Sequence, residues 1–241
     1  MTYCCGILVR DGLVMIADTR TNAGLDNVST FRKLHIFSNP GERIVAVACA
    51  GNLAISQSVL STLTEGMEDP ETGEVETLMN APTMFQAAQR IGKAIRMVHA
   101  TEGPALKAED ISFDVSFLFG GQIKGSRMRL FMVYTAGNFI ECTTDTPYLQ
   151  IGEHKYGKPI LDRVVKPTTS LSDAQKAVLL SMDSTLRSNL SVGMPLDLAV
   201  IDRDACKVTQ KRRIEAGDPA FRAMSEAWSN ALRDGFAKIE I

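Results

Sequence analysis

The sequence lacks a long apolar run and an excess of charge of either sign. No stretch approaches the ~18 apolar residues of a transmembrane helix, and no basic segment leads into an apolar one at the N-terminus. The 26 Lys and Arg residues nearly balance the 28 Asp and Glu residues, so the net charge is only -2. We therefore expect a cytoplasmic protein that binds neither a membrane nor a nucleic acid, with a small molecule or a peptide as substrate.

Glycine and proline are not enriched either. The 18 Gly and 9 Pro residues among 241 exclude collagen-like and low-complexity classes. Hydrophobic residues make up 45% of the chain, which is enough for a full core, and no flexible linker divides it. We expect one domain over residues 1–241.

The five cysteines form no disulfide framework and no metal site. Their number is odd, no CxxC spacing occurs, and Cys4 and Cys5 are adjacent on a predicted strand, where successive side chains point to opposite faces. We interpret the five as reduced, small, buried hydrophobic residues: Cys4, Cys5, Cys49, Cys142 and Cys206.

Histidine is rare, and the common motifs of metal and serine enzymes are absent. His35, His99 and His154 have no metal-ligand spacing, and HExxH, GxSxG and Gly-rich phosphate loops do not occur. The sequence therefore predicts no metal and no organic cofactor. The three histidines are interpreted as structural or solvent-facing.

Hydrophobic periodicity and turn residues predict strands and helices in separate blocks. The predicted strands cover residues 3–9, 13–17, 33–37, 43–50, 113–119, 128–135, 138–143, 148–152, 196–202 and 206–212. The predicted helices cover residues 52–63, 83–99, 156–165, 170–189 and 218–233. Residues 19–30 are polar and unassigned, and residues 65–80 are expected to form an exposed connection. This order indicates an α+β fold rather than an alternating parallel sheet.

Thr2 is the first candidate for catalysis. Removal of Met1 would leave a threonine with a free α-amine at the start of a buried strand. A hydroxyl needs a base to become a good nucleophile, and an α-amine with a pKa of ~7.7 to 8.0 is suited to that role. Thr at position 2 is common in proteins of every kind, so its context decides.

The context of Thr2 supplies charge partners and an anion site. Asp18 ends the strand that pairs back across the Asp11-Gly12 turn, so the hairpin register can place its carboxylate near Thr2. Lys33 begins the next strand, and a lysine held by an aspartate lowers the cost of an alkoxide. The run Ala48-Cys49-Ala50-Gly51-Asn52 passes from strand to helix, where backbone N–H groups can stabilise an oxyanion.

These residues resemble a known family. The chain is similar to proteasome β subunits and to the bacterial HslV peptidase, and most closely to the bacterial proteasome homologues called Anbu (ancestral β subunit). The similarity is most specific in the first fifty residues, and the order of strands and helices extends it over the chain. It rests on Thr2-Tyr3-Cys4 after Met1, on Asp11-Gly12, on residues 16–24 (IADTRTNAG), on residues 27–33 (NVSTFRK) and on Ala50-Gly51-Asn52.

The resemblance implies a four-layer αββα sandwich of the N-terminal-nucleophile hydrolase type, and it implies roles for single residues. Thr2 would be the nucleophile, Asp18 and Lys33 its charge partners, and the Gly51 amide the oxyanion donor. Related peptidases place an aspartate and a serine in a nearby loop.

That loop corresponds to residues 188–193, and here it departs from the family pattern. Ser191 fits the family's serine, whereas Ser188 stands where the aspartate is expected, so this part of the network is altered. The spacing from Asp18 to Lys33 is also one residue shorter than in the proteasome pattern.

Three further features have simpler interpretations. The acidic stretch 65–76 is interpreted as a solvated loop, with substrate selection at a pore entrance as the alternative. Trp228 is assigned to a core or subunit-contact face of the last helix. The cluster Lys211-Arg212-Arg213 has too few charges for a nucleic-acid site.

The leading hypothesis is a threonine-type peptidase that acts on a peptide or unfolded protein through an acyl-enzyme on Thr2. Two alternatives remain: an assembly or binding subunit with little proteolysis, and an amidohydrolase acting on a small amide. Apolar faces on three predicted helices, together with the resemblance, imply a homo-oligomer that forms an open ring or a helical assembly. The sequence does not reveal whether an ATPase partner exists.

Overall fold

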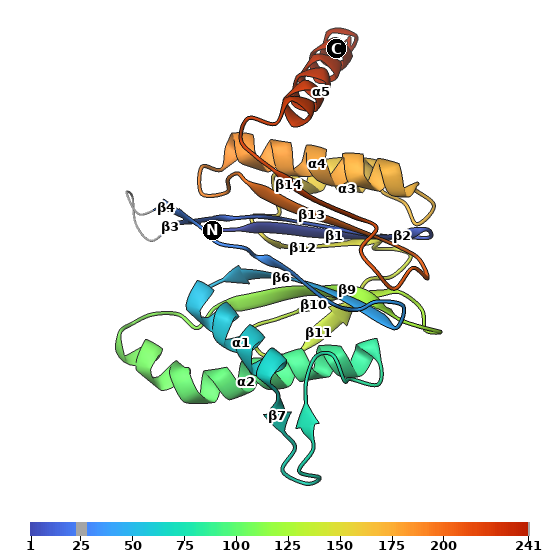
Figure 1. Ribbon diagram of the computed structural model, residues 1–241. Helices are drawn as coiled ribbons and strands as arrows, with labels where there is room; N and C mark the ends of the chain where they lie inside the picture. The colour runs from blue at the N-terminus through green and yellow to red at the C-terminus, as the bar shows by residue number, and fades with distance from the viewer. Residues whose placement is uncertain (23–27, 241) are drawn as a thin grey trace.

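Two antiparallel five-stranded sheets form the centre of the molecule. The structure is a computed structural model that describes residues 1–22 and 28–240 (Figure 1). The first sheet has the order β12-β1-β2-β13-β14, and the second has the order β11-β10-β9-β6-β5. The bounds of the first are β12 Tyr148–Gly152, β1 Tyr3–Val9, β2 Gly12–Asp18, β13 Leu196–Asp202 and β14 Gln210–Ile214. Those of the second are β11 Phe139–Glu141, β10 Arg129–Val133, β9 Val115–Ile123, β6 Arg43–Gly51 and β5 Leu34–Asn39.

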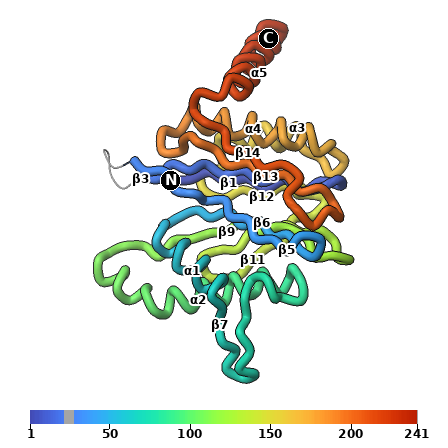
Figure 2. The backbone as a smooth tube through the Cα atoms, in the orientation of Figure 1, coloured from blue at the N-terminus to red at the C-terminus, as the bar shows by residue number. Residues whose placement is uncertain are grey.

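Helices cover the outer face of each sheet. Figures 1 and 2 show α3 and α4 above the first sheet, the two sheets facing each other, and α1 and α2 below the second. A further helix, α5, leaves the body beyond α4. The helices are α1 Leu53–Glu65, α2 Met84–Ala108, α3 Lys158–Val164, α4 Leu171–Ser188 and α5 Pro219–Ala237. The predicted α+β class with antiparallel sheets is confirmed.

Three hydrophobic clusters hold these elements together. One joins α1 and α2 to the second sheet around Phe117 and Phe119, and another joins α3 and α4 to the first sheet around Tyr3 and Ile16. The third lies between the sheets and includes Cys4 together with neighbouring strand residues. Because strand side chains alternate between faces, β1 sends Tyr3 toward α4 and Cys4 toward the other sheet.

The N-terminal hairpin forms as predicted, although its turn begins one residue before the predicted Asp11-Gly12. β1 pairs with β2 from Cys4 opposite Ala17 to Val9 opposite Gly12, across a turn at Arg10 and Asp11. β2 in turn pairs with β13, and Asp18 lies opposite Leu196. The hairpin thereby brings the end of β2 back to the start of the chain.

The predicted start of the last strand was wrong. The prediction began it at Cys206, whereas β14 begins at Gln210. Asp204 and Cys206 have φ values of 64° and 44°, in the left-handed region, so this segment turns instead of extending. β14 therefore begins only at Gln210, which pairs with Val200 of β13.

Other predicted boundaries differ in length. α2 continues beyond His99 to Ala108 and includes Pro104. The polar stretch after β2 contains β3 Arg20–Asn22 and β4 Val28–Thr30, which pair with each other, while residues 23–27 lie outside the described part of the chain. The exposed connection contains a small hairpin of β7 Met67–Glu68 and β8 Val75–Glu76, which projects below α2 in Figure 1.

All five cysteines are buried free thiols, as predicted. Of the helices that the structure describes, none combines the length and apolar character needed to cross a membrane.

Candidate functional site

Lys33 and Asp18 form a buried ion pair. Lys33 Nζ donates a hydrogen bond to Asp18 Oδ1 at 2.9 Å, and the side chains are 4% and 0% exposed. Lys33 Nζ also donates to the carbonyl oxygen of Arg20 at 2.6 Å. The end of β2 and the residue before β5 are thus tied together by a charge-assisted bond with little access to water.

Two backbone groups complete the environment of Asp18. The Tyr3 N–H donates to Asp18 Oδ1 at 3.1 Å, and the Gly193 N–H donates to Asp18 Oδ2 at 3.2 Å. Burial raises the pKa of Asp18, while the Lys33 ammonium and these two N–H groups act in the opposite direction. The carboxylate therefore joins three segments that are far apart in sequence.

Thr2 is held at the end of β12. Its carbonyl oxygen accepts a hydrogen bond from the Glu153 N–H at 2.7 Å, and Gly152 lies opposite Tyr3 in the strand pairing. Gly152 has φ +77°, and a Cβ atom there would lie 1.9 Å from the Thr2 carbonyl oxygen. Only glycine lets the two chains approach this closely.

Tyr3 anchors the strand that follows Thr2. Its hydroxyl lies 2.6 Å from Ser181 Oγ of α4 and accepts a hydrogen bond from Gln150. The ring is fully buried, and burial raises the pKa of the Tyr3 hydroxyl well above its usual value. This neutral anchor fixes the first residues of β1 against α4.

A cavity of about 310 Å³ brings the predicted site residues together. Thr2, Lys33 and Gly51 all line it, with Asp18 behind Lys33. The remaining lining residues are Met1, Thr21, Cys49, Ala50, Asn52, Leu53 and Ser56. The cavity therefore has the hydroxyl-bearing Thr2, an ammonium group and a strand-to-helix junction around one space.

Cys49 is the other nucleophilic side chain in this cavity. Its thiol is buried, and burial raises the pKa of Cys49 to about 11. A thiol with this pKa is almost entirely protonated at neutral pH and is a poor nucleophile. Cys49 is therefore a weak candidate for the nucleophile of this cavity.

Gly51 lies where β6 passes into α1. It has φ +103°, and a Cβ atom there would lie 2.4 Å from the Asp114 carbonyl oxygen. Asn52 caps α1 by accepting hydrogen bonds from the N–H groups of Ala54 and Ile55. The junction therefore has one fixed backbone orientation at the wall of the cavity.

The loop after α4 reaches Asp18 through Gly193, and its serines lie differently. Ser188 is exposed at the end of α4. Ser191 is half-buried, with its N–H donating to Asn189 Oδ1 at 2.9 Å, and the cavity lining does not include it. Arg20 holds the loop by donating to the Leu190 carbonyl oxygen at 2.9 Å.

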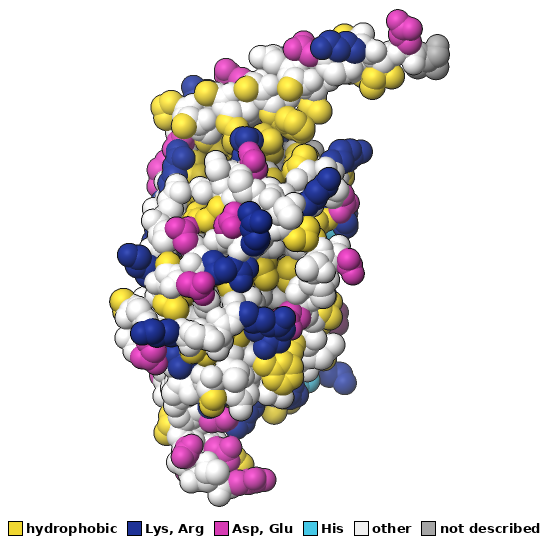
Figure 3. Space-filling model, turned by 90° about the vertical axis from the view of Figure 1, so that its right-hand side faces the viewer, with side chains coloured by type: hydrophobic (Ala, Val, Ile, Leu, Met, Phe, Trp, Pro, Cys, Tyr) yellow, Lys and Arg dark blue, Asp and Glu magenta, His cyan; other side chains and the backbone are white. Residues whose placement is uncertain are grey.

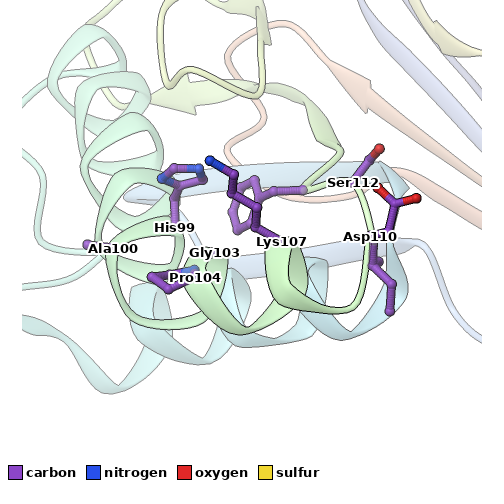
Figure 4. A pocket seen from close by; sticks show the side chains of 9 residues that line it. His99, Ala100, Gly103, Pro104, Lys107, Asp110 and Ser112 are labelled. Carbon is purple, nitrogen blue, oxygen red and sulfur yellow. The ribbon is translucent and has the colours of Figure 1, made fainter.

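A larger cavity, of about 600 Å³, lies away from these residues at the C-terminal end of α2 (Figure 4). His99, Lys107, Asp110 and Ser112 surround it, and the His99 ring meets Phe113 edge to face at 4.7 Å. The lining includes none of the five predicted site residues, and most of it is exposed surface. Cavity volume therefore does not identify the site here. The smaller cavity at Thr2 is the one lined by a hydroxyl, an ammonium group and a strand-to-helix junction.

Within residues 1–22 and 28–240, no cluster of three or more His, Cys, Asp or Glu side chains is arranged to hold a metal ion.

Two glycines of the site were not predicted from sequence. Gly152 and Gly193 act through the space that they leave for Thr2 and for the Arg20 guanidinium. Gly152 ends a predicted strand, which is a weak signal for a left-handed residue. Gly193 lies in the loop already aligned with the family, but its N–H bond to Asp18 has no sequence signature.

Searches of protein-family models and of curated proteins gave no match. The structure is similar along its whole length to several solved structures. The Gly-1 mutant of Anbu from Hyphomicrobium sp. strain MC1 is 51% identical, with 100% of this chain and 99% of that chain covered and a TM-score of 0.92. Anbu from Yersinia bercovieri is 47% identical, with 99% and 97% covered and a TM-score of 0.89. A structure described as the helical assembly of the Anbu complex from Pseudomonas aeruginosa is 44% identical, with 99% and 97% covered and a TM-score of 0.91.

Proposed function

The chain belongs to the Anbu (ancestral β subunit) family, and from this premise we propose that it is a threonine-type peptidase that cleaves amide bonds through Thr2. The observation that carries the proposal is the buried pair of Lys33 and Asp18, because its ammonium lines the same cavity as Thr2. A buried ion pair that lined no cavity would have only a structural role. Here it lies where an alkoxide would need a positive charge.

The proposed reaction begins with removal of Met1. While Met1 is attached, the nitrogen of Thr2 is an amide and cannot accept a proton. The free amine takes the proton of the Thr2 hydroxyl, and Oγ attacks the carbonyl carbon of the substrate amide. The amine proton then goes to the leaving nitrogen, and water attacks the resulting ester to release the acid and restore Thr2.

Other residues of the cavity stabilise charge during these steps. Lys33, oriented by Asp18, lowers the energy of the developing alkoxide. The Gly51 N–H donates to the oxyanion of the tetrahedral intermediate, and the cap at Asn52 holds that amide in place. Ser191 is the candidate for a supporting polar group in the loop that reaches Asp18.

The proposed substrate is a peptide or an unfolded protein, in a cytoplasmic setting. The order of helix, sheet, sheet and helix layers in Figure 1 supports assignment to the four-layer αββα sandwich of N-terminal-nucleophile hydrolases. The hydrophobic cluster between the two sheets supports one peptidase domain over residues 1–241.

Self-association is part of the proposal. The relative from Pseudomonas aeruginosa is described as a helical assembly, and the aligned region covers 99% of this chain. We extend the same property to this protein, as a homo-oligomer in an open ring or helical form. Whether an ATPase feeds substrate to it is left to binding experiments.

One observation favours a second candidate, an assembly subunit with little proteolysis. Ser188 occupies the position of the family aspartate and is exposed at the end of α4. The support that this aspartate gives to the nucleophile in relatives would then be missing. Ser188→Asp offers a direct comparison, because it restores the carboxylate without altering the cavity lining.

The test combines intact mass with peptide hydrolysis. Purified protein whose mass shows loss of Met1 should cleave short fluorogenic peptide amides or casein, and Thr2→Ala should abolish this cleavage. Thr2→Ser is the matched control, since it keeps both the hydroxyl and the amine. Cleavage that survives Thr2→Ala would assign the chemistry elsewhere, and a Met1-free protein inactive on every substrate would favour the assembly subunit.

A further inference from the structure

The residue that hydrogen-bonds the backbone of Thr2, Glu153, lies in a fixed turn. Its N–H donates to the Thr2 carbonyl oxygen at 2.7 Å. The His154 N–H donates to the Gly152 carbonyl oxygen at 2.8 Å, which closes a three-residue turn centred on Glu153. The His154 ring nitrogen Nδ1 lies 3.0 Å from the same oxygen. The backbone of Glu153 is therefore held against Thr2 at the end of β12.

The carboxylate of Glu153 has no partner in the chain that still carries Met1. The side chain is half-buried, and within residues 1–22 and 28–240 it takes part in no hydrogen bond and no ion pair. It borders the backbone of Thr2 and is not part of the cavity lining. A carboxylate in a partly buried place is stabilised by a nearby cation. Removal of Met1 creates such a cation, the α-ammonium of Thr2.

This new positive charge arises beside an existing one. The Lys33 ammonium lines the same cavity as Thr2, and like charges at short range disfavour each other. Two other basic side chains near Thr2 have partners in the backbone. Arg20 donates to a carbonyl oxygen of the loop after α4, and the exposed ring of His154 lies against the turn. The α-ammonium therefore needs an acidic partner.

The acidic groups already assigned to the site do not supply that partner. Asp18 is engaged by Lys33 and by two backbone N–H groups. Ser188 stands where the family pattern has an aspartate, and it is exposed at the end of α4. Glu153 is the acidic residue that hydrogen-bonds the Thr2 backbone, and a glutamate side chain is long enough to reach the nitrogen of the residue that it faces.

We propose that Glu153 is a positioning residue, whose carboxylate binds the α-amine of Thr2 after Met1 is removed and holds it beside the threonine hydroxyl. The contact favours the protonated amine and opposes the effect of Lys33. The amine can then both take the hydroxyl proton and give it to the leaving nitrogen near neutral pH. An acid from the turn after β12 replaces the one that the family pattern places after α4. The inference rests on the proposed function, because it requires the free amine of Thr2.

The first test measures the α-amine directly. Met1-free protein, verified by intact mass, is treated with a trace of acetic anhydride at a series of pH values, and mass spectrometry of the N-terminal peptide gives the pKa of the α-amine. Glu153→Gln should lower this pKa by about 1, because it removes a negative charge beside the ammonium. The same change is expected in the Thr2→Ala background, where no hydroxyl can take up the acetyl group.

Two further variants separate charge from structure. Glu74→Gln is the matched control, because Glu74 is an exposed carboxylate in the β7–β8 hairpin. This hairpin projects below α2 in Figure 1, and Figure 3 shows acidic side chains gathered at that end of the molecule. Glu74→Gln should leave the pKa of the α-amine unchanged. Glu153→Asp keeps the charge on a shorter side chain and should retain part of the effect, whereas a purely structural role predicts that it behaves like Glu153→Gln.

Peptide hydrolysis separates the charge of Glu153 from its hydrogen bond. Glu153→Gln keeps an acceptor, so kcat/KM at alkaline pH should stay within about threefold of the wild type, while the contribution of the amine to the acid limb moves to lower pH. Glu153→Ala loses both the charge and the acceptor and should lower kcat/KM at every pH by at least about tenfold.

The outcomes distinguish this proposal from the proposed function. An α-amine with the same pKa in the wild type and in Glu153→Gln would overturn the role of Glu153, even in an active peptidase. A lower pKa in Glu153→Gln, in a protein that cleaves no peptide, would support the contact and count against the proposed hydrolysis. Quantitative retention of Met1 in protein from its own host would end both proposals, because no α-amine of Thr2 would exist.

Discussion

Lys33 Nζ and Asp18 Oδ1 lie 2.9 Å apart in an environment that is almost closed to water, although fifteen residues separate them in the chain. Lys33 lines one cavity together with Thr2 and Gly51, and Asp18 lies behind Lys33. A buried ion pair is weak evidence for stability by itself, because desolvation offsets much of the attraction. Its location at the cavity that Thr2 lines is what the proposed catalytic role explains.

Replacing Lys33 should remove activity. Lys33→Ala removes the ammonium beside Thr2 and leaves the Asp18 carboxylate buried without its cation, at a cost of about 3–5 kcal/mol of folding free energy. Lys33→Arg should not restore cleavage, because a broad guanidinium cannot reproduce a compact ammonium in this space. Peptide hydrolysis and thermal melting of both variants measure the two effects, and an active Lys33→Arg enzyme would exclude a requirement for the lysine ammonium.

The acid limb of the pH profile should contain a contribution from Asp18 in addition to that of the Thr2 α-amine. Burial raises the pKa of Asp18, so it accepts a proton at a higher pH than an ordinary aspartate as the solution is acidified. Protonation removes the counter-charge of Lys33, so kcat/KM should fall as the pH decreases through that pKa.

Asp18→Asn should show reduced activity and should lose the contribution of Asp18 to the acid limb, while the contribution of the Thr2 α-amine remains. The amide keeps a hydrogen-bond acceptor but has no titrating charge, so its activity should lie between those of the wild type and Lys33→Ala. An Asp18→Asn enzyme with the wild-type kcat/KM and the same acid limb would remove Asp18 from the site.

Gly152 should be required for the position of Thr2. Gly152→Ala would place a Cβ atom 1.9 Å from the Thr2 carbonyl oxygen, so the chain end must move, and we expect at least a tenfold loss of kcat/KM. Gly125→Ala is the matched control, because Gly125 has nearly the same φ, +76° against +77°, and nothing lies within 4 Å of its would-be Cβ atom. Equal losses in both variants would show that backbone strain alone, and not contact with Thr2, is responsible.

Local patterns in the sequence were sufficient to predict much of the fold and the centre of the site. The signal at Asp11-Gly12 predicted the hairpin, whose turn lies at Arg10 and Asp11, and the pairing of β1 with β2 is what returns Asp18 to the start of the chain. Lys33 begins one predicted strand and Gly51 follows another, and the family resemblance implied that both lie near Thr2. The three residues line one cavity.

Contacts between distant segments could not be predicted in this way. The approach of Gly152 to Thr2 and the Gly193 N–H bond to Asp18 depend on backbone geometry that composition does not encode. The predicted start of the last strand was wrong for the same reason. Asp204 and Cys206 have positive φ values before β14, but neither residue type requires one. The length of α2 was underestimated because its apolar residues recur at helical spacing only to Val98, whereas the helix continues through Pro104 to Ala108.

The most direct measurement is the location of a covalent label from a peptide vinyl sulfone, an electrophile that traps catalytic nucleophiles. Tandem mass spectrometry of the labelled, Met1-free protein should place one adduct on Thr2, and Thr2→Ala should take up none. The adduct should also be lost in Lys33→Ala, whose nucleophile lacks its ammonium partner. An adduct on Cys49 or on any other residue of an actively cleaving enzyme would contradict the assignment of Thr2 as the nucleophile.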